Sequence, residues 1–353
     1  MRKPTTLKDV AGALGMHKST VSLALSGKGT ISAETRRRVT QVAHELGYEP
    51  NVIAQRLARG TETATVQILS GMLDVGIATE KILLIQQELS AHGFEVPLYT
   101  WHSLSASKEN SERQAAQVRG LCRQRPRAIV CAVQRLPDAI LQELDAYQAR
   151  GGIVISYDTE VPYEWDQIVF DREENAYRAA KHLLEAGHRK LGLGMSHLRE
   201  PHSPTDPQVH RLRGFQKALA EFGVPFQSQW FFHTSTYERG GAELAKQFLA
   251  LEDRPTALAI VNDYMAMALM TELTRAGMRL PDDLSLIGHD NQPIAAYCPV
   301  PLTTLTQPTD TIAEAVVAQL RERLQSTSAP PARIPIESVL VKRGSVTPPK
   351  ERR

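Results

Sequence analysis

Three short helical patterns occupy the first 48 residues of the chain, and they limit this segment to a small all-α fold. The first pattern begins at Thr6, whose hydroxyl and the carboxylate of Asp9 are spaced as in a capping box, and it ends at Gly15. A second pattern runs from about residue 18 to residue 26, and Ser32 caps a third. Only a tight turn separates the first two patterns, which is the arrangement of a helix-turn-helix unit.

The second helix of such a unit lies in the major groove of DNA, with its N-terminal side chains against base edges. Lys18 can donate to guanine, and Leu23 can contact a thymine methyl. Ser22, Thr35 and Tyr48 are predicted to donate hydrogen bonds to phosphates. The full set of predicted DNA contacts in this segment comprises Thr6, Leu7, His17, Lys18, Ser19, Thr20, Ser22, Leu23, Ser32, Thr35 and Tyr48.

The charge distribution favours a nucleic-acid partner for this segment. Residues 1–60 carry ten Lys or Arg and four Asp or Glu, a net charge of +6, whereas the remaining residues carry 31 and 35, a net charge of −4. A basic module on a mildly acidic body indicates that only the module binds a polyanion. The alternative is a small helical bundle with a solvated basic face, and charge alone does not decide between the two.

Four motifs within residues 5–58 carry a resemblance to a known family. They are T-L-K-D-V-A, S-T-V-S, S-A-E-T-R-R-R-V and L-G-Y-x-P-N. Their order and spacing resemble the headpiece of the lactose-repressor (LacI) family. This resemblance implies a transcriptional repressor that binds a pseudo-palindromic operator in double-stranded DNA as a homodimer.

The segment after Pro50 resembles the hinge of the same family. About eight helical residues are too few for a stable isolated helix, so a partner is expected to order this segment. In the family, two hinge helices pair at the centre of the operator, where a leucine enters the minor groove and bends the duplex. The matching residue is Leu57, and the other predicted hinge residues at the DNA are Asn51, Ala54 and Gln55.

Two residues of the second helical pattern depart from the family. Leu23 stands where the family commonly has arginine, and His17 stands where a serine or threonine N-cap is usual. An arginine–guanine contact cannot form at position 23. The operator half-site is therefore expected to differ from the commonest one of the family.

Beyond Thr61, short apolar runs alternate with helical stretches. The predicted strands are 66–69, 95–99, 128–132, 152–156, 167–170, 190–194, 257–261 and 285–289, and the predicted helices are 79–92, 108–124, 137–149, 173–187, 207–222, 238–251, 263–276 and 309–325. This alternation predicts an α/β body of two doubly wound parallel-sheet lobes. Ligands of such sheets bind at the carboxyl ends of the strands, here in the expected cleft between the lobes.

Motifs such as F-D-R-E-E-N-A (170–176), V-N-D-Y-M-A (261–266) and L-P-D-D-L-S-L-I-G-H-D (280–290) resemble the periplasmic-binding-protein-like sensor domain of the same family. The resemblance implies that Arg211, Asn262 and Asp290 hold the polar groups of a small-molecule effector. Asp158, at a strand end, and Tyr237, an aromatic that could stack on a sugar, are further candidates. A guanidinium opposite carboxylate and amide groups suits a polyhydroxylated or partly anionic ligand, so we expect a sugar or a sugar derivative.

Other features of the body have two interpretations at this stage. Tyr163, Trp165 and Tyr264 could line the effector site or could be ordinary packing residues. The proline-rich and histidine-rich stretch 195–210 could be a ligand lid or an exposed insertion.

The predicted organisation is a headpiece (1–50), a hinge helix and linker (51–61), an effector-binding and dimerisation domain (62–345) and a tail (346–353). By analogy with the family, the chain crosses between the lobes near residues 161, 291 and 324. Lobe 1 would then comprise 62–161 and 292–323, and lobe 2 would comprise 162–291 and 324–345.

Other classes of protein receive little support. Gly192-Leu193-Gly194 lacks the third glycine of a dinucleotide fingerprint, and the sequence has no P-loop or nucleophile elbow, so neither catalysis nor a cofactor is expected. The histidines lack metal-ligand spacing. Neither a secretory signal nor an apolar run of about 18 residues is apparent, so we expect no membrane partner and a location on the nucleoid in the bacterial cytoplasm. The rival interpretations are a periplasmic solute-binding protein and an architectural DNA-bending protein with a vestigial sensor.

Overall fold

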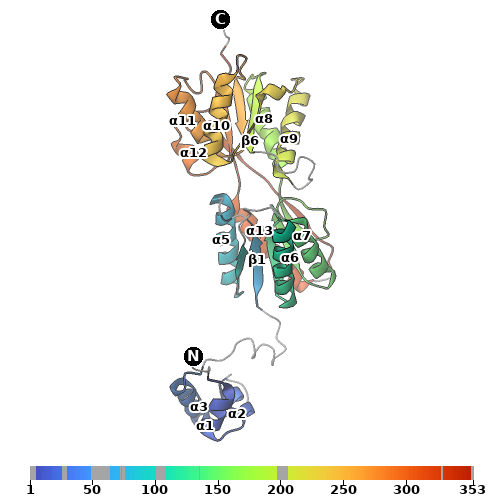
Figure 1. The fold of residues 1–353 in the computed structure, drawn as a ribbon, viewed down its shortest axis with the longest axis vertical. Coiled ribbons are helices and arrows are strands. Elements are labelled where there is room, and N and C mark those ends of the chain that lie inside the picture. Colours follow the sequence, from blue (N-terminus) through green and yellow to red (C-terminus); the bar gives the residue numbers. More distant parts are fainter. Residues whose placement is uncertain are drawn as a thin grey trace. The chain divides into compact units, whose positions relative to one another are not determined.

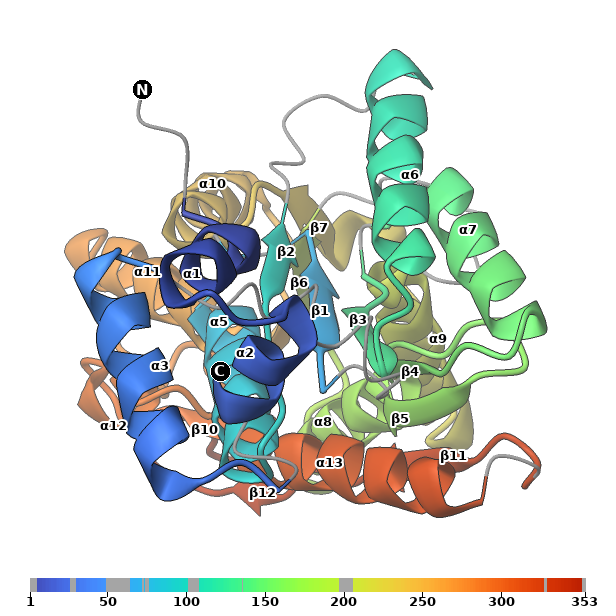
Figure 2. The same ribbon diagram turned by 90° about the horizontal axis from the view of Figure 1, so that it is seen from below.

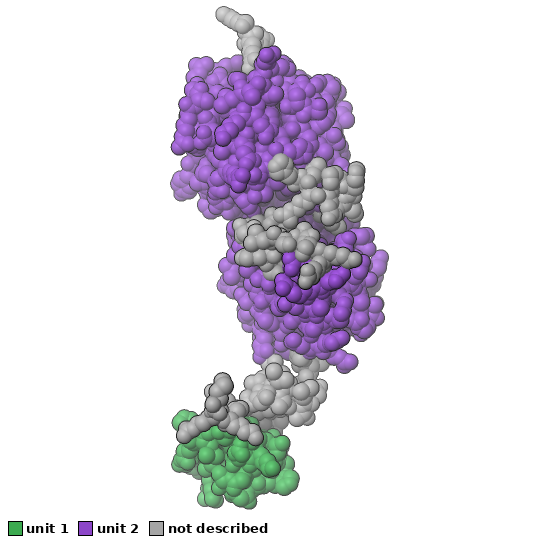
Figure 3. Space-filling model, in the orientation of Figure 1, with its two compact units in different colours: residues 1–63 green, residues 64–353 purple. Residues whose placement is uncertain are grey.

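Two units make up the chain, Met1–Thr63 and Ala64–Arg353 (Figure 3). The computed structural model describes residues 5–25, 30–48, 64–71, 73, 76–100, 108–134, 136–196, 206–326 and 329–350. Each unit buries a set of hydrophobic residues of its own, as independently folding units do.

The N-terminal unit contains the three predicted helices, α1 (Leu7–Leu14), α2 (Lys18–Leu25) and α3 (Ala33–Glu45). The capping box is confirmed, because the backbone N and the Oγ1 of Thr6 both donate to the Asp9 carboxylate, at 2.8 and 2.7 Å. Gly15 ends α1 at φ 61°, in the left-handed region that glycine adopts without strain. One fully buried valine from each helix, Val10, Val21 and Val39, forms the centre of the shared core.

The second unit contains two six-stranded sheets, and each belongs to one lobe (Figure 1). The sheet of lobe 1 has the order β11-β5-β4-β3-β1-β2, and all its strand pairs are parallel. Its strands are β1 (Val66–Ser70), β2 (Leu98–Thr100), β3 (Ala128–Ala132), β4 (Val154–Asp158), β5 (Asp166–Phe170) and β11 (Arg333–Ile336), and its helices are α5 (Gly76–Ala91), α6 (Lys108–Arg123), α7 (Asp138–Ala149) and α13 (Thr309–Gln325).

Helices cover both faces of the lobe 1 sheet. Ile68 faces α5 and α13, whereas its neighbour Leu69 faces α6 and α7, because successive side chains of a strand point to opposite faces. α6 and α7 lie side by side in Figures 1 and 2. A sheet buried on both faces requires almost continuous apolar strands, which is why β1, β3 and β4 contain no exposed residue.

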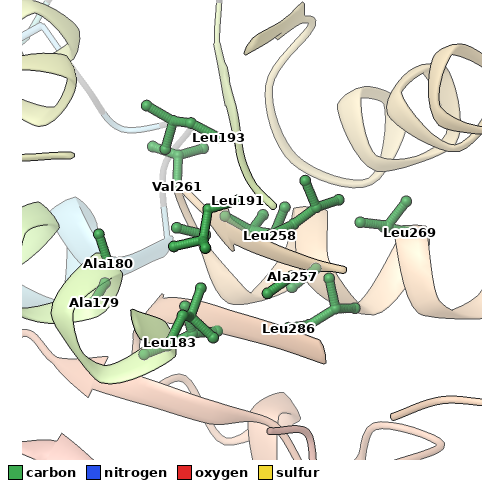
Figure 4. Packing of buried hydrophobic residues seen from close by; sticks show 14 of the residues in the cluster. Ala179, Ala180, Leu183, Leu191, Leu193, Ala257, Leu258, Val261, Leu269 and Leu286 are labelled. Atoms are coloured by element: carbon green, nitrogen blue, oxygen red, sulfur yellow. The ribbon is translucent and has the colours of Figure 1, made fainter. Parts of the chain in front are cut away.

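The sheet of lobe 2 has the order β12-β10-β9-β8-β6-β7. Its pairs are parallel except for β12, which runs antiparallel to β10 at the edge. Leucine and alanine side chains from the strands and from α8 and α11 form the part of its core that Figure 4 shows. The strands are β6 (Leu191–Ser196), β7 (Phe231–Thr234), β8 (Ala257–Ile260), β9 (Ser285–Asp290), β10 (Thr303–Thr306) and β12 (Leu340–Val341), and the helices are α8 (Arg172–Glu185), α9 (Pro207–Glu221), the 3-10 turn η1 (Ser228–Trp230), α10 (Tyr237–Ala250), α11 (Asp263–Arg275) and α12 (Ile294–Tyr297).

The predicted crossings between the lobes near 161, 291 and 324 are wrong. The chain instead crosses between β5 and α8, between β10 and α13, and between β11 and β12 (Figure 1). The reason is a long-range pairing: β11 adds to β5 with Ile334 opposite Ile168, so both strands belong to lobe 1. Likewise β10 pairs with β9, which keeps residues 303–306 in lobe 2.

Candidate functional site

The exposed face of α2 carries the residues predicted to read DNA. His17, Lys18, Ser19, Ser22 and Leu23 are all exposed, whereas Val21 between them is fully buried. Leu23 exposes 42% of its surface, which leaves its side chain accessible to a partner. The Nδ1 of His17 lies 2.8 Å from the Oγ of Ser19, so the imidazole is held at the start of the helix.

The other predicted DNA contacts in the N-terminal unit have structural roles as well. Thr6 and Ser32 cap α1 and α3, and the Oγ of Ser32 lies 2.8 Å from the Oγ1 of Thr35. Leu7 and Tyr48 are partly buried against the helical core. Thr20 is also partly buried. The four hinge residues, Asn51, Ala54, Gln55 and Leu57, lie outside the described residues.

Two of the candidate effector residues lie at the carboxyl ends of strands, one in each lobe. Asp158 is the last residue of β4 and Asp290 is the last residue of β9. Both have left-handed backbones, with φ of 83° and 96°, and Tyr237 at the start of α10 has φ of 57°. Residues other than glycine seldom adopt this conformation, and those that do concentrate at functional sites. The sequence pattern had placed two of these residues at strand ends but gave no sign of the backbone conformation.

A buried ion pair holds Asp158. The Nζ of Lys81, on α5, donates to the Asp158 carboxylate, and both side chains are almost completely buried. The Arg172 guanidinium, at the start of α8 in lobe 2, donates through Nη1 to the Asp158 backbone carbonyl at 3.0 Å and to Thr159 Oγ1 at 3.2 Å. Its Nη2 lies 4.0 Å from the Asp158 carboxylate. One aspartate therefore connects a helix of lobe 1 with the first residue of a helix in lobe 2.

The charged side chains around Asp158 shift the pKa values of this carboxyl and of Lys81. Burial opposes ionisation of Asp158, but Lys81 and Arg172 outweigh it and hold the pKa of this carboxyl below its usual range. Burial also lowers the pKa of the Lys81 ammonium, although Asp158 acts in the opposite direction.

Lys81 and Arg172 are functional candidates that the sequence analysis missed. Lys81 had a detectable signal, because it occupies the same helical stripe as the buried residues Ala78, Ile82 and Ile85. A lysine on the buried stripe of a helix needs a partner. That partner, Asp158, is 77 positions away in sequence, so only the fold identifies it.

Arg211 is brought to the cluster by a close approach of two helices. It lies on α9, and its Nη1 donates to Gln208 Oε1 at 3.3 Å. Gly214 on the same helix has no room for a side chain, because an added Cβ would lie 1.9 Å from the Glu173 carbonyl oxygen on α8. The first turns of the two helices therefore lie close together. Burial lowers the pKa of the Arg211 guanidinium to about 10, and the charge of Arg172 contributes to this shift.

Asn262 and Tyr237 complete the set of predicted effector residues. Asn262 is the N-cap of α11, and its Oδ1 accepts a hydrogen bond from the Met265 backbone N at 2.8 Å. Tyr237 stands edge-to-face with Tyr264, with ring centroids 6.4 Å apart, and it also packs against Ala78 of lobe 1. An aromatic side chain of lobe 2 therefore touches lobe 1 beside Lys81.

Two other aromatic candidates are packing residues of lobe 1. Trp165 is 1% exposed and stacks on Tyr163 with ring centroids 4.6 Å apart. Its indole donates to Asp145 at 3.2 Å, and it directly precedes β5. It therefore lies at the amino end of that strand, whereas Asp158 lies at the carboxyl end of β4. Of the 195–210 stretch, residues 197–205 lie outside the described residues.

Three neighbouring groups of lobe 2 have displaced pKa values. Burial, followed by the charge of Asp290, raises the pKa of Asp263 to about 8, although this carboxyl accepts hydrogen bonds from Thr304 Oγ1 and the Gln292 backbone N, both at 2.7 Å. Burial also raises the pKa of Asp290. Burial, and then the Arg211 charge, lowers the pKa of His289 to about 4.

Replacing His289 by Phe is expected to weaken the acid sensitivity of the second unit. Because the imidazole takes up a proton near pH 6.5 when unfolded but only near pH 4 when folded, the wild-type unit loses about 2–3 kcal/mol of stability from this group as the pH falls from 7.5 to 4.5. The His289→Phe variant should lack that loss. Urea unfolding at a series of pH values measures it, and parallel profiles for the two proteins would contradict the prediction.

Comparison with known proteins now identifies the family. The sequence model of bacterial regulatory proteins of the lacI family matches residues 6–51, and that of the periplasmic binding protein-like domain matches residues 180–346. The chain belongs to the LacI family. This LacI-family chain is therefore a DNA-binding transcriptional regulator, as the two matched segments, a helix-turn-helix unit and a sensor lobe, predict.

Individual relatives extend the similarity to almost the whole chain. The HTH-type transcriptional repressor PurR of Photobacterium profundum is 29% identical over 320 residues, which cover 91% of this chain and 92% of the relative. A structure of the Lac repressor bound to ONPG in the repressed state is 25% identical in sequence and has a TM-score of 0.79. The match covers 98% of this chain and 100% of the Lac repressor chain. A Lac repressor dimer bound to operator and the anti-inducer ONPF, 24% identical, has the same fold with a TM-score of 0.79 and the same coverage.

Two features are absent from the described residues of this LacI-family chain. Within those residues, no helix is both long enough and apolar enough to cross a membrane. The same part of the chain contains no group of three or more His, Cys, Asp or Glu side chains that could hold a metal ion.

Proposed function

We propose that this regulator represses transcription as a homodimer bound to a pseudo-palindromic operator, and that a carbohydrate effector bound between the lobes controls its DNA affinity. The similarity to a PurR repressor and to a Lac repressor bound to ONPG supports this proposal. So does the convergence of polar groups from both lobes on Asp158. We further propose that it acts in the bacterial cytoplasm, without catalytic activity of its own.

The proposed effector contacts combine predicted and newly found residues. Arg211 and Asp290, both partly exposed, offer a donor and an acceptor to the hydroxyl groups of a sugar. The Tyr237 ring, packed against Ala78 of lobe 1, offers an apolar face for a sugar ring. The proposed site comprises Lys81, Asp158, Arg172, Arg211, Tyr237, Asn262 and Asp290.

The proposed DNA contacts are made by the exposed face of α2 and by the hinge. His17, Lys18 and Ser19 stand at the start of the helix, where the base edges are read. Leu23 replaces the usual arginine with an apolar contact, which suits a thymine methyl better than a guanine. The hinge proposal covers residues 51–61, with Leu57 in the minor groove.

The route from effector to DNA runs through the crossings between the lobes. Arg172 is the first residue of α8, directly after the crossing from β5, and it bonds to Asp158 across the two lobes. A ligand that contacts these groups changes the orientation of one lobe relative to the other. In a dimer this change alters the separation of the two hinges. Effector and operator must then alter each other's affinity by the same factor.

Replacing Arg211 by Ala is expected to weaken the effector response at least about tenfold while preserving operator binding. Loss of a guanidinium that bonds the ligand weakens binding by about 1.5–3 kcal/mol, or roughly tenfold to more than a hundredfold. Arg213→Ala is the matched control, because Arg213 lies one residue beyond Leu212 on α9 but is exposed. Operator binding is measured by fluorescence anisotropy with and without a compound found by thermal shift. An unchanged response of Arg211→Ala would remove this residue from the site.

The dimer is tested separately. Sedimentation at concentrations that saturate the operator should give twice the mass of the 39.1 kDa chain. A monomer that binds the operator with full affinity would contradict the homodimer.

A further inference from the structure

A concentration of arginines on lobe 1 has no part in the sites described above. Residues 113–137 contain six arginines and no aspartate or glutamate, although the chain after residue 60 carries a net charge of −4. Four of these arginines fall in the last turns of α6 or in the loop between α6 and β3, namely Arg119, Arg123, Arg125 and Arg127. The negative net charge of the body therefore conceals a basic surface.

An arginine that follows the neighbouring helix joins this group. α6 and α7 lie side by side (Figure 2), and Arg150 directly follows the end of α7. The Nε of Arg119 donates to the Glu143 carboxylate on α7 at 2.9 Å. This hydrogen bond, and then the charges of Arg119, Arg150 and Arg123, hold the pKa of Glu143 below its usual range. We call the five side chains the arginine patch: Arg119, Arg123, Arg125, Arg127 and Arg150.

Most of the arginine patch is accessible to a partner. Arg123, Arg125 and Arg150 are exposed, and Arg127 is partly exposed. Within the part of the chain that the structure describes, neither Arg123 nor Arg150 has a carboxylate within 4.0 Å. Exposed guanidinium groups of this kind can each donate several hydrogen bonds to phosphate oxygens.

The backbone of Arg125 is an independent sign that this surface has a function. Seven other helices in the described part of the chain are followed by a glycine with positive φ, whereas α6 is followed by Arg125 at φ 50°. Glycine adopts this left-handed conformation without strain, but a residue with a side chain does not. The dipole of α6 favours a cation at Arg123, in its last turn, but it does not require an arginine in a strained position beyond the helix. Backbone strain of this kind concentrates at functional sites.

The arginine patch lies where the chain from the first unit enters the second. The backbone N of Arg127 donates to the Thr65 carbonyl at 2.7 Å. Glu95 accepts from Thr65 Oγ1 at 3.4 Å, and together with Glu143 it leaves the patch a net charge of +3, five arginines minus two carboxylates. Because residues 49–63 span at most about 54 Å when fully extended, a duplex held by the first unit stays within reach of this surface.

We propose that the arginine patch of lobe 1 binds the phosphate backbone of the duplex that the headpiece holds. It is a second DNA-binding surface, on the sensor domain, separate from α2 and from the hinge. Contacts to phosphates strengthen and orient a complex without reading its sequence, so this surface adds affinity rather than specificity. The inference rests on operator binding by the headpiece, which is part of the proposed function.

The first experiment removes three exposed charges of the patch from the full-length chain, with Arg123→Gln, Arg125→Gly and Arg150→Gln combined. Glycine at position 125 also relieves the backbone strain, so this substitution does not endanger the fold. Operator affinity is measured by fluorescence anisotropy between about 50 and 200 mM salt. A dimer that loses one phosphate contact per chain should show a slope of log K against log salt that is shallower by about 1.8, and an affinity at least about tenfold lower at about 0.1 M salt.

Two matched variants separate phosphate binding from other causes. Lysine at the same three positions keeps the charge and should keep a slope close to that of the wild type. Glutamine in place of three exposed arginines of lobe 2, Arg213, Arg275 and Arg279, changes the net charge by the same amount and should leave slope and affinity unchanged. In every variant the ratio of affinities for the operator and for a duplex with one altered base pair in each half-site should equal that of the wild type, because phosphate contacts carry no sequence information.

Specific outcomes overturn the inference. Equal salt slopes for the wild type and the neutralised patch would exclude phosphate contacts there, and equal losses for the neutral and the lysine variants would show that the charge is not what matters. Operator binding by the headpiece would stand in both cases. Should the triple variant fail to fold, Arg125→Gly alone still decides, because it is expected to make the slope shallower without lowering the melting temperature. A wild-type chain that selects no duplex from a random library would instead contradict the proposed operator binding itself.

Discussion

A chain that begins at Ala64 is expected to lose all sequence-specific DNA binding and to keep its effector affinity. The two units bury separate cores, one around Val10, Val21 and Val39 and the others within residues 64–353, so removing the first unit exposes no core of the second. Specific complexes of such regulators are about 10³–10⁷ times tighter than their non-specific ones. We therefore expect the affinity for the operator to fall by at least about a thousandfold.

The measurement uses an operator selected from a random duplex library with the full-length chain. Anisotropy titrations of both chains are made at one salt concentration, because phosphate contacts make every such affinity depend on salt. Calorimetry with the same effector serves as the control and should give equal dissociation constants. A truncated chain that enriches the same duplex would place the DNA-reading surface in the second unit, and a loss of effector binding would show that the units are not independent.

Replacing Lys81 by Met is expected to destabilise the second unit by about 3–5 kcal/mol, which is a large part of the roughly 5–15 kcal/mol that stabilises a typical domain. The methionine fills a similar volume, so the loss comes from Asp158, whose buried carboxylate would keep only Arg172, 4.0 Å away. Adding Asp158→Asn to the same variant removes that charge and should restore most of the stability. Urea unfolding followed by circular dichroism measures these changes.

Lys190→Met provides the matched control for this prediction. Lys190 also pairs with an aspartate, Asp253, at 2.6 Å, but both side chains are about half exposed. An exposed pair contributes within about 1 kcal/mol, so this variant should differ little from the wild type. Equal effects of the two lysine substitutions would mean that burial of the Lys81–Asp158 pair has no energetic consequence.

The two halves of the chain differ in how much of their fold can be read from sequence. The N-terminal unit could be predicted in detail because its signals are local: a cap at Thr6, a glycine at 15, a cap at Ser32 and apolar residues one turn apart. Most strands and helices of the second unit were also recognisable from apolar runs and helical periodicity, but β7, β10, β11 and β12 were not among the predicted strands. Their assignment to lobes was not, because strand pairing joins residues as distant as 168 and 334.

The N-terminal headpiece has the three helices that the sequence predicted, and Lys18 and Leu23 lie on its exposed face. The sequence by itself determined the helix-turn-helix unit, the two-lobed α/β body and the aspartates at two strand ends, because each depends on residues close together in the chain. Only the tertiary structure decided where the chain crosses between lobes, and that Lys81 and Arg172 meet at Asp158. The physical reason is that charge pairing and sheet edges depend on distance in space, which no local pattern encodes.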